Sequence, residues 1–337
     1  MKVSTLGAAL CATVLAVPAI AATAADGIGF VLDRDGENLI VSTNLEDIMG
    51  SSTTVRLNGA GSPTLNALAY RPNTGVLYGY SSDTDSAYTI NTMTGQLRRV
   101  GTPGMNRDDG AMPVQTTPEP GFDFNNMADA ARIVGETGEN LVFFPQDFGD
   151  ERAGQILRFT DPFYVDGDEQ TGRPPIVGNA YTNAVSVDAN PDLTTQQFVI
   201  LDTAMGGALG TLNNNDGDVD TIGNLVFPGP NGNLNQSSGF DILSLAVGDN
   251  LGFVQARGED GNSALYTIAM TDLDADRAFG DVVLSFVSSY GQTVRSLAIA
   301  PADRVNQPPA VPVPAAGLLL LGGLGTLGAL KARRRKA

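Results

Sequence analysis

Two aspartates in a repeated tripeptide are the residues whose type could do chemistry. Asp123 lies in the stretch GFDF at 121–124, and Asp241 lies in the related stretch GFDI at 239–242. Glycosidases use a pair of carboxylates about 5 to 10 Å apart. An aspartate that recurs at the same place in two units more often accepts hydrogen bonds from the backbone of a turn. We therefore regard the pair as a candidate for carboxylate-dependent catalysis and favour the structural interpretation.

Acidic clusters form a second group of candidates. Two runs place aspartates at alternate positions: Asp216, Asp218 and Asp220, and Asp272, Asp274 and Asp276. Alternating oxygen ligands are typical of calcium loops. Neither run completes such a loop, because the twelfth position counted from Asp272 is Val283, and Asp-Gly is also a common hairpin turn. We expect no cofactor, with a structural calcium ion at one of these runs as a hypothesis.

The composition excludes most other catalytic chemistry. The chain has no His, its single Cys is Cys11, and its Lys residues are Lys2, Lys331 and Lys336. Nucleophile pairs that need His, Cys or Lys are therefore absent from the body, as are His or Cys ligands for zinc, copper or iron. These absences favour a protein that is not an enzyme.

The charge balance excludes nucleic acid as a partner. The chain has 20 Lys plus Arg against 37 Asp plus Glu. Six of the cationic residues lie in the terminal segments, which leaves the body with about −23. Binding to phosphate requires clustered cations, so we expect no contact with nucleic acid.

The elements that must position these residues are short strands separated by turns. Residues 65–100 predict four strands joined by hairpins, and no part of the body has a sustained helical period. Pieces of this meander recur: GFDF as GFDI, YTI at 88–90 and 266–268, and LAYRP at 68–72 as LAIAP at 297–301. Recurrence at about 40 to 50 residues is typical of propeller blades.

We therefore predict an all-β, β-propeller-like domain over residues 26–302, with about six irregular four-stranded blades. The last strand of the body, 297–301, has the sequence of a first strand, so residues 30–33 and 39–42 are expected to complete its sheet. A β-sandwich with coincidental repeats is the alternative.

A series of motifs also resembles a known family. GFDFNNMADAARIVGETGENLVF, NAYTN at 179–183, FVILDT, NNNDGDVDTIGNL and SGFDI follow one another in this order. They are similar to an exported bacterial family of unknown function, and the resemblance implies a propeller-like fold without assigning catalytic residues. Asn126 replaces the proline usual after GFDFN, and residues 161–175 look like an insertion.

The N-terminus has the form of a signal peptide over residues 1–25. Lys2 precedes an apolar run from Val3 to Val17, and small residues of the A-x-A form follow at 19–21 and 22–24. We expect the mature chain to begin near Ala25.

The C-terminus predicts a membrane-anchored tail. Residues 303–314 contain four prolines and form an expected stalk, and the 16 residues 315–330 would span about 24 Å as a transmembrane helix. The basic end at 331–337 would stay in the cytoplasm. Its cationic residues are Lys331, Arg333, Arg334, Arg335 and Lys336.

The start of this tail resembles a sorting signal. Val311, Pro312, Val313, Pro314 and Ala315 are similar to the VPxPA variety of PEP-CTERM-type tails. The resemblance implies that an exosortase-like protease cuts the chain near the motif and passes the body from the inner membrane to the cell surface or the medium. A permanent single-span anchor is the alternative.

These observations predict a function class without a ligand. We expect an exported, non-enzymatic binding or structural protein of the cell surface or extracellular matrix, with extracellular polysaccharide as a candidate partner. The alternative is a carboxylate-dependent, glycan-active enzyme of the cell envelope.

Overall fold

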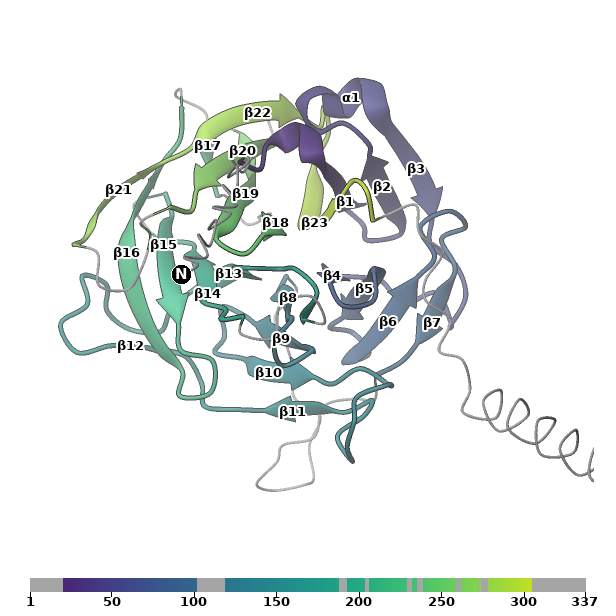
Figure 1. Cartoon of the computed structure of the whole chain (residues 1–337), viewed down its shortest axis with the longest axis horizontal. Helices are drawn as coiled ribbons and strands as arrows, with labels where there is room; N and C mark the ends of the chain where they lie inside the picture. The colour runs from purple at the N-terminus through teal and green to yellow at the C-terminus, as the bar shows by residue number, and fades with distance from the viewer. Residues whose placement is uncertain are drawn as a thin grey trace, which may run out of the picture.

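The strands form five separate sheets arranged as a closed ring (Figure 1). The computed structural model describes residues 21–101, 119–187, 193–203, 206–228, 232–234, 239–258, 262–271, 273 and 278–304. The prediction of an all-β propeller is confirmed. The alternative of a β-sandwich is wrong, because the sheets stand around a common centre instead of packing as two layers.

The prediction of six blades is wrong, since the ring has five. The repeat spacing assumed equal blades of four strands. The fourth and fifth blades instead take up additional strands, so their sheets have six and five strands. Their strands are also longer, as in the 10-residue β19. The same length of chain therefore makes fewer blades.

Blade 1 closes the ring by pairing the two ends of the body, as predicted. Its order is β23-β1-β2-β3, with Gly27 opposite Pro301 and Asp33 opposite Val294. Two 3-10 helices, η1 (Ala24–Asp26) and η2 (Leu45–Asp47), and the helix α1 (Ile48–Ser51) lie in the same part of the chain. The strands are β1 (Gly27–Asp33), β2 (Asn38–Ser42), β3 (Ser52–Arg56) and β23 (Val294–Pro301).

Blades 2 and 3 are regular four-stranded antiparallel meanders. Blade 2 contains β4 (Ala67–Arg71), β5 (Val76–Ser81), β6 (Ser86–Ile90) and β7 (Leu97–Arg99). Blade 3 contains β8 (Gly121–Asn125), β9 (Ala130–Val134), β10 (Asn140–Phe143) and β11 (Ile156–Arg158).

Blade 4 has two additional strands that cover its outer edge. Both pair in parallel with β16, one along its first half and one along its second half. The first of them lies in the predicted insertion at 161–175, where Asp168 also accepts a hydrogen bond from Thr221 N. An uncovered edge strand can pair with the wrong strand, and β12 covers part of this edge. The strands are β13 (Ile176–Tyr181), β14 (Gln197–Leu201), β15 (Ala208–Leu212), β16 (Asp218–Val226), β12 (Phe163–Tyr164) and β21 (Gly280–Val283).

Blade 5 carries the second copies of the repeated motifs at the expected places. GFDI lies on its innermost strand, as GFDF does in blade 3, and YTI lies on its third strand, as in blade 2. The strands are β18 (Gly239–Ala246), β19 (Asp249–Gly258), β20 (Ser263–Ala269), β22 (Ser285–Ser289) and β17 (Gly232–Asn233), which extends the sheet beside β18.

Apolar residues pack between neighbouring blades, and one cluster lies at each of the five junctions. The innermost strands β4, β8, β13, β18 and β23 contact one another in turn around the axis. Their first residues meet at one end of the ring, which we name the start face, and their last residues meet at the other, the end face. Burial of apolar area at these junctions is the main force that holds the blades together.

Within the described ranges, no helix is long and apolar enough to cross a membrane. The predicted stalk from residue 305 onward, the predicted helix at 315–330 and the basic end lie outside those ranges.

Candidate functional site

The two candidate aspartates point from one blade to the backbone of the next. Asp123 on β8 accepts a hydrogen bond from Tyr181 N on β13 at 2.8 Å. Asp241 on β18 accepts one from Ile299 N on β23 at 2.5 Å. Each aspartate is only 5 % exposed. The two carboxylates thus accept hydrogen bonds from backbone, but the donors lie on strands of the neighbouring blade and not in a turn, where the sequence interpretation had placed them.

Burial raises the pKa of both carboxyl groups. For Asp241 the pKa rises to about 7, although the N–H groups of Ile299 and Ile242 act to lower it. For Asp123, burial is the largest cause and the charge of Asp241 raises the pKa further. A buried carboxyl group that accepts hydrogen bonds from the backbone of the next blade suits a structural contact better than a nucleophile.

The space beside these aspartates at the start face is small. The hollow there has a volume of about 10 Å³, which is near the minimum for one water molecule. Neither Asp123 nor Asp241 lines it. The hollow therefore offers no room for a sugar beside the carboxylates.

The junction between blades 3 and 4 contains a network of polar side chains. Arg132 donates to Asn140 Oδ1 at 2.7 Å and to Asn215 Oδ1 of blade 4 at 3.1 Å. Asn140 donates to the carbonyl of Asn214 at 3.1 Å. The guanidinium of Arg132 also lies 5.3 Å from the ring centre of Phe159. Val134 is the blade 3 residue in the apolar cluster at this junction, so the polar contacts supply much of the connection.

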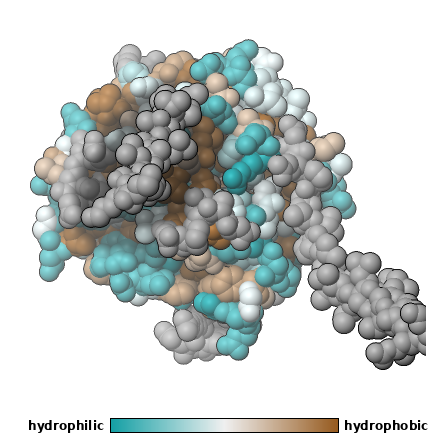
Figure 2. Space-filling model, viewed as in Figure 1, coloured by the Kyte–Doolittle hydropathy of each residue, from teal (hydrophilic) through white to brown (hydrophobic). Residues whose placement is uncertain are grey.

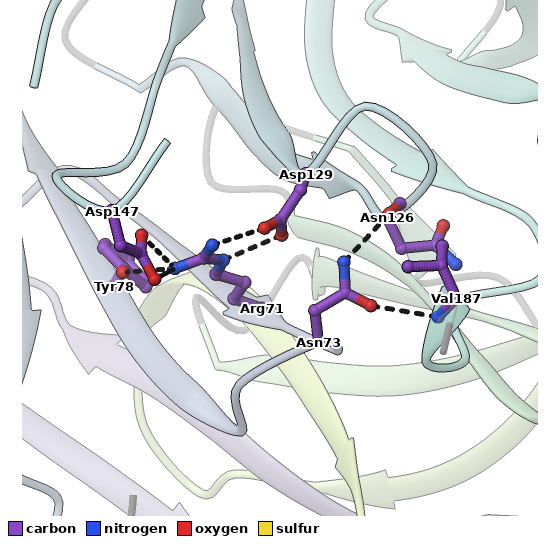
Figure 3. Close-up of polar contacts among 7 residues, drawn as sticks. All are labelled: Arg71, Asn73, Tyr78, Asn126, Asp129, Asp147 and Val187. Atoms are coloured by element: carbon purple, nitrogen blue, oxygen red, sulfur yellow. Dashed lines mark hydrogen bonds and ion pairs between the residues drawn. The ribbon is translucent and has the colours of Figure 1, made fainter. Parts of the chain in front are cut away.

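A second polar cluster surrounds Arg71 at the end of β4 (Figure 3). Its guanidinium forms ion pairs with Asp129 and, at 2.8 Å, with Asp147, both of blade 3. The Arg71 side chain is 4 % exposed. Burial acts to lower its pKa, but the two carboxylates outweigh burial and raise it. The guanidinium is therefore permanently charged, and its ion pairs join blade 2 to blade 3.

Three asparagines continue these links along the end face. Asn73 donates to the carbonyl of Asn126 at 3.0 Å and accepts from Val187 N at 3.1 Å (Figure 3). Asn126 in turn donates to the carbonyls of Asn183 and Val185 at 2.6 Å. Asn126 thus makes two contacts that a proline at this position could not.

The calcium candidates are only partly within the described ranges. Asp216 and Asp218 receive hydrogen bonds from Asn213 Nδ2 at 3.0 and 3.4 Å. Asp220 lies on β16, while Asp272, Asp274 and Asp276 lie outside the described ranges. Among the residues that the structure describes, no three acidic, His or Cys side chains are grouped so as to hold a metal ion.

The end face has a much larger hollow than the start face, a cavity of about 380 Å³ between blades 5 and 1. It combines two carboxylates and one guanidinium with apolar side chains. Its lining residues are Ala25, Asp26, Ser244, Leu245, Pro301, Ala302, Asp303 and Arg304. Elsewhere, polar residues are spread over the rim of the face in Figure 2 in several groups and form no single patch.

Comparison with known proteins assigns the family. The sequence model of a domain of unknown function, DUF4394, matches residues 39–298. The chain belongs to the DUF4394 family. The match covers blades 2 to 5 and part of blade 1, from β2 to most of β23 and without β1. No curated protein matches this DUF4394 chain.

Solved structures resemble the DUF4394 ring only distantly. A structural genomics protein of unknown function from Bacteroides thetaiotaomicron has 12 % identity and a TM-score of 0.40, and the alignment covers 80 % of this chain and 56 % of that one. The DUF4394 chain thus spans just over half the length of that protein. A chain of a nidogen/laminin complex has 8 % identity and a TM-score of 0.42, with coverage of 82 % and 99 %. TolB from Acinetobacter baumannii has 14 % identity and a TM-score of 0.37, with coverage of 82 % and 67 %.

The sequence motifs contain several of the residues that join the blades, but they do not show which contacts those residues make. The sequence assigns no individual role to Arg71, Asn73, Arg132 or Asn140. A charged residue inside a strand that is otherwise apolar, as in AARIV at 130–134, is the signal that could have identified Arg132. Many of the polar residues in these motifs thus make contacts between blades.

Proposed function

We propose that this DUF4394 protein is an exported, non-enzymatic binding or structural protein of the cell surface or extracellular matrix. One observation carries the proposal. The motif residues that could do chemistry, Asp123, Asp241, Arg71 and Arg132, are buried and bonded to neighbouring blades. Because these residues stabilise the fold, the outer surface and the chain ends are left to provide the function.

The chain ends support export and sorting. The predicted signal peptide would direct the body across the inner membrane, and the tail from Val311 to Ala315 resembles a VPxPA-type signal. Both ends of the body belong to blade 1, because β1 pairs with β23. An exosortase-like protease acting on the tail would therefore release a closed ring whose last strand is held in a sheet.

The cavity at the end face is the place that we propose for a polysaccharide ligand. Asp26 and Asp303 could accept hydrogen bonds from sugar hydroxyls, and Arg304 could donate them. Leu245 and Pro301 provide apolar area for the C–H face of a sugar ring. A volume of about 380 Å³ lies in the range of small-molecule sites.

An intact-mass measurement tests the sorting part of the proposal. The mature protein from its native host is predicted to lack residues 315–337. A body that retains this segment would contradict sorting and support a permanent anchor.

A glycan array followed by an activity screen on the same sugars tests the binding part. We expect binding without turnover, weakened at least tenfold by Arg304→Ala and unchanged by the matched change Arg56→Ala on β3. Turnover that Asp123→Asn or Asp241→Asn abolishes in a folded protein would instead establish the glycan-active enzyme. Binding that Arg304→Ala leaves intact would move the site away from the cavity.

A further inference from the structure

Two peptide bonds near the N-terminus meet the requirements of signal peptidase. The motifs at 19–21 and 22–24 both have the A-x-A form, so the sequence allows a mature chain that begins at Ala22 or at Ala25. The two products differ by the three residues 22–24. The contacts of those residues distinguish the two sites.

Residues 22–24 are part of the folded ring. Ala22 and Ala24 pack against the apolar cluster between blades 5 and 1, whereas Ala21 is exposed. Thr23 donates from its backbone N and its hydroxyl to Asp26 Oδ2, at 2.9 and 2.6 Å. Cleavage after Ala24 would remove all of these contacts and cut the chain inside the stretch that begins η1.

The backbone nitrogen of Ala22 already lies against a carboxylate. It is 2.8 Å from Oδ1 of Asp249, the first residue of β19 in blade 5. Cleavage after Ala21 would convert this same nitrogen from an amide to an α-amino group, which carries a positive charge at pH 6.5. A hydrogen bond with a neutral donor would then become an ion pair between the chain start and blade 5.

We propose that signal peptidase cuts between Ala21 and Ala22 and that the new α-ammonium group of Ala22 pairs with Asp249. This inference rests on the proposed export of the protein. It places the mature start three residues before the position expected from the sequence. Processing then also strengthens an existing contact at the junction of blades 5 and 1.

The first experiment reads the N-terminal residue of the exported protein. The full chain is expressed with its own leader in a Gram-negative bacterium, and the N-terminal peptide of the exported protein is identified by mass spectrometry. Ala22 is the expected first residue. Ala25 or any other cleaved start would overturn the inference and leave export standing, whereas a chain that retains Met1 would overturn export itself.

The second experiment tests the ion pair through the melting temperature. Asp249→Asn keeps the shape of the side chain and removes its charge, so it should lower the melting temperature of the exported body by about 1–3 °C at pH 6.5. Asp83→Asn, which removes one charge from an exposed turn of blade 2, is the matched control and should have no such effect. Equal melting temperatures for the two variants would overturn the ion pair.

A third variant separates the ion pair from the packing of the segment. Ala21→Leu removes the small residue before the first bond and leaves the motif at 22–24, so cleavage should move to the bond after Ala24. The resulting body should melt at a lower temperature than the normal one, and adding Asp249→Asn should not lower it further. A further loss of the same size in this shorter body would show that Asp249 acts through another contact and overturn the proposal.

Discussion

Replacement of Asp241 by Asn should change how the stability of the ring depends on pH. Burial holds the pKa of Asp241 at about 7 in the folded protein, against about 3.9 in an unfolded chain. The folded state therefore binds the proton more tightly than the unfolded state. This stabilisation is therefore complete below about pH 4 and is lost as the pH rises through 7.

The size of the effect follows from the same two values. Between pH 5 and pH 8, the unfolding free energy should fall by about 2–3 kcal/mol through Asp241. Asp241→Asn remains neutral throughout, so it should lose this part of the pH dependence. The variant also loses one backbone hydrogen bond, because its amide NH₂ cannot accept one, at a cost of about 1–3 kcal/mol at every pH.

Urea unfolding at pH 5, 6, 7 and 8, followed by circular dichroism, measures both effects. The variant should be less stable than the parent at pH 5 and should recover relative to it by about 2 kcal/mol at pH 8. Asp83→Asn is the control, since Asp83 is exposed and should leave the profile unchanged. If Asp241→Asn and its parent had parallel pH profiles, the carboxyl group would not be buried against Ile299, and the structural role would be refuted.

Three further substitutions test other parts of the ring. Arg71→Met should lower the unfolding free energy by about 2 kcal/mol, because both ion pairs are lost. The loss is no larger because the two carboxylates are partly exposed and can be hydrated in the variant. Asn126→Ala should cost about 1–3 kcal/mol, since two carbonyls of blade 4 lose their donor. Gly223→Ala should release β21 from β16, because an added Cβ would lie 1.7 Å from the carbonyl oxygen of Gly280.

Each of these has a direct measurement. Urea midpoints at low and high salt measure the first two, and an Arg71→Met variant as stable as the parent would contradict the buried ion pairs. Hydrogen exchange measures the third. Faster exchange at 280–283 with unchanged exchange in blade 2 is expected, and unchanged exchange at 280–283 would contradict the close approach of the two strands.

The sequence was sufficient for the fold class because blade periodicity is a local signal. Hairpin turns and alternating apolar residues predicted the meanders, and the likeness of 297–301 to a first strand predicted the closure of the ring. The blade count was not accessible in the same way. β21 lies between two strands of blade 5 in sequence and pairs with blade 4 in space, and no local pattern reports which neighbour a strand will choose.

The roles of the polar residues could be predicted only in part. The repeat of Asp123 and Asp241 indicated architecture, since two equivalent positions in two blades face equivalent backbone. The partners of Arg71 and Arg132 in neighbouring blades are 58 to 83 residues away in the chain. Such pairs depend on the stacking of whole blades, which the spacing of residues within one blade does not encode.

A double-mutant cycle between Arg132 and Asn215 is the most direct test that polar side chains hold the blades together. Arg132→Met, Asn215→Ala and the double variant are unfolded in urea, and the coupling free energy is calculated from the four values. We expect a coupling free energy of at least about 1 kcal/mol between Arg132 and Asn215, as for a hydrogen bond to a charged group. A coupling free energy near zero, with the variants as stable as the parent, would show that these residues do not link blades 3 and 4.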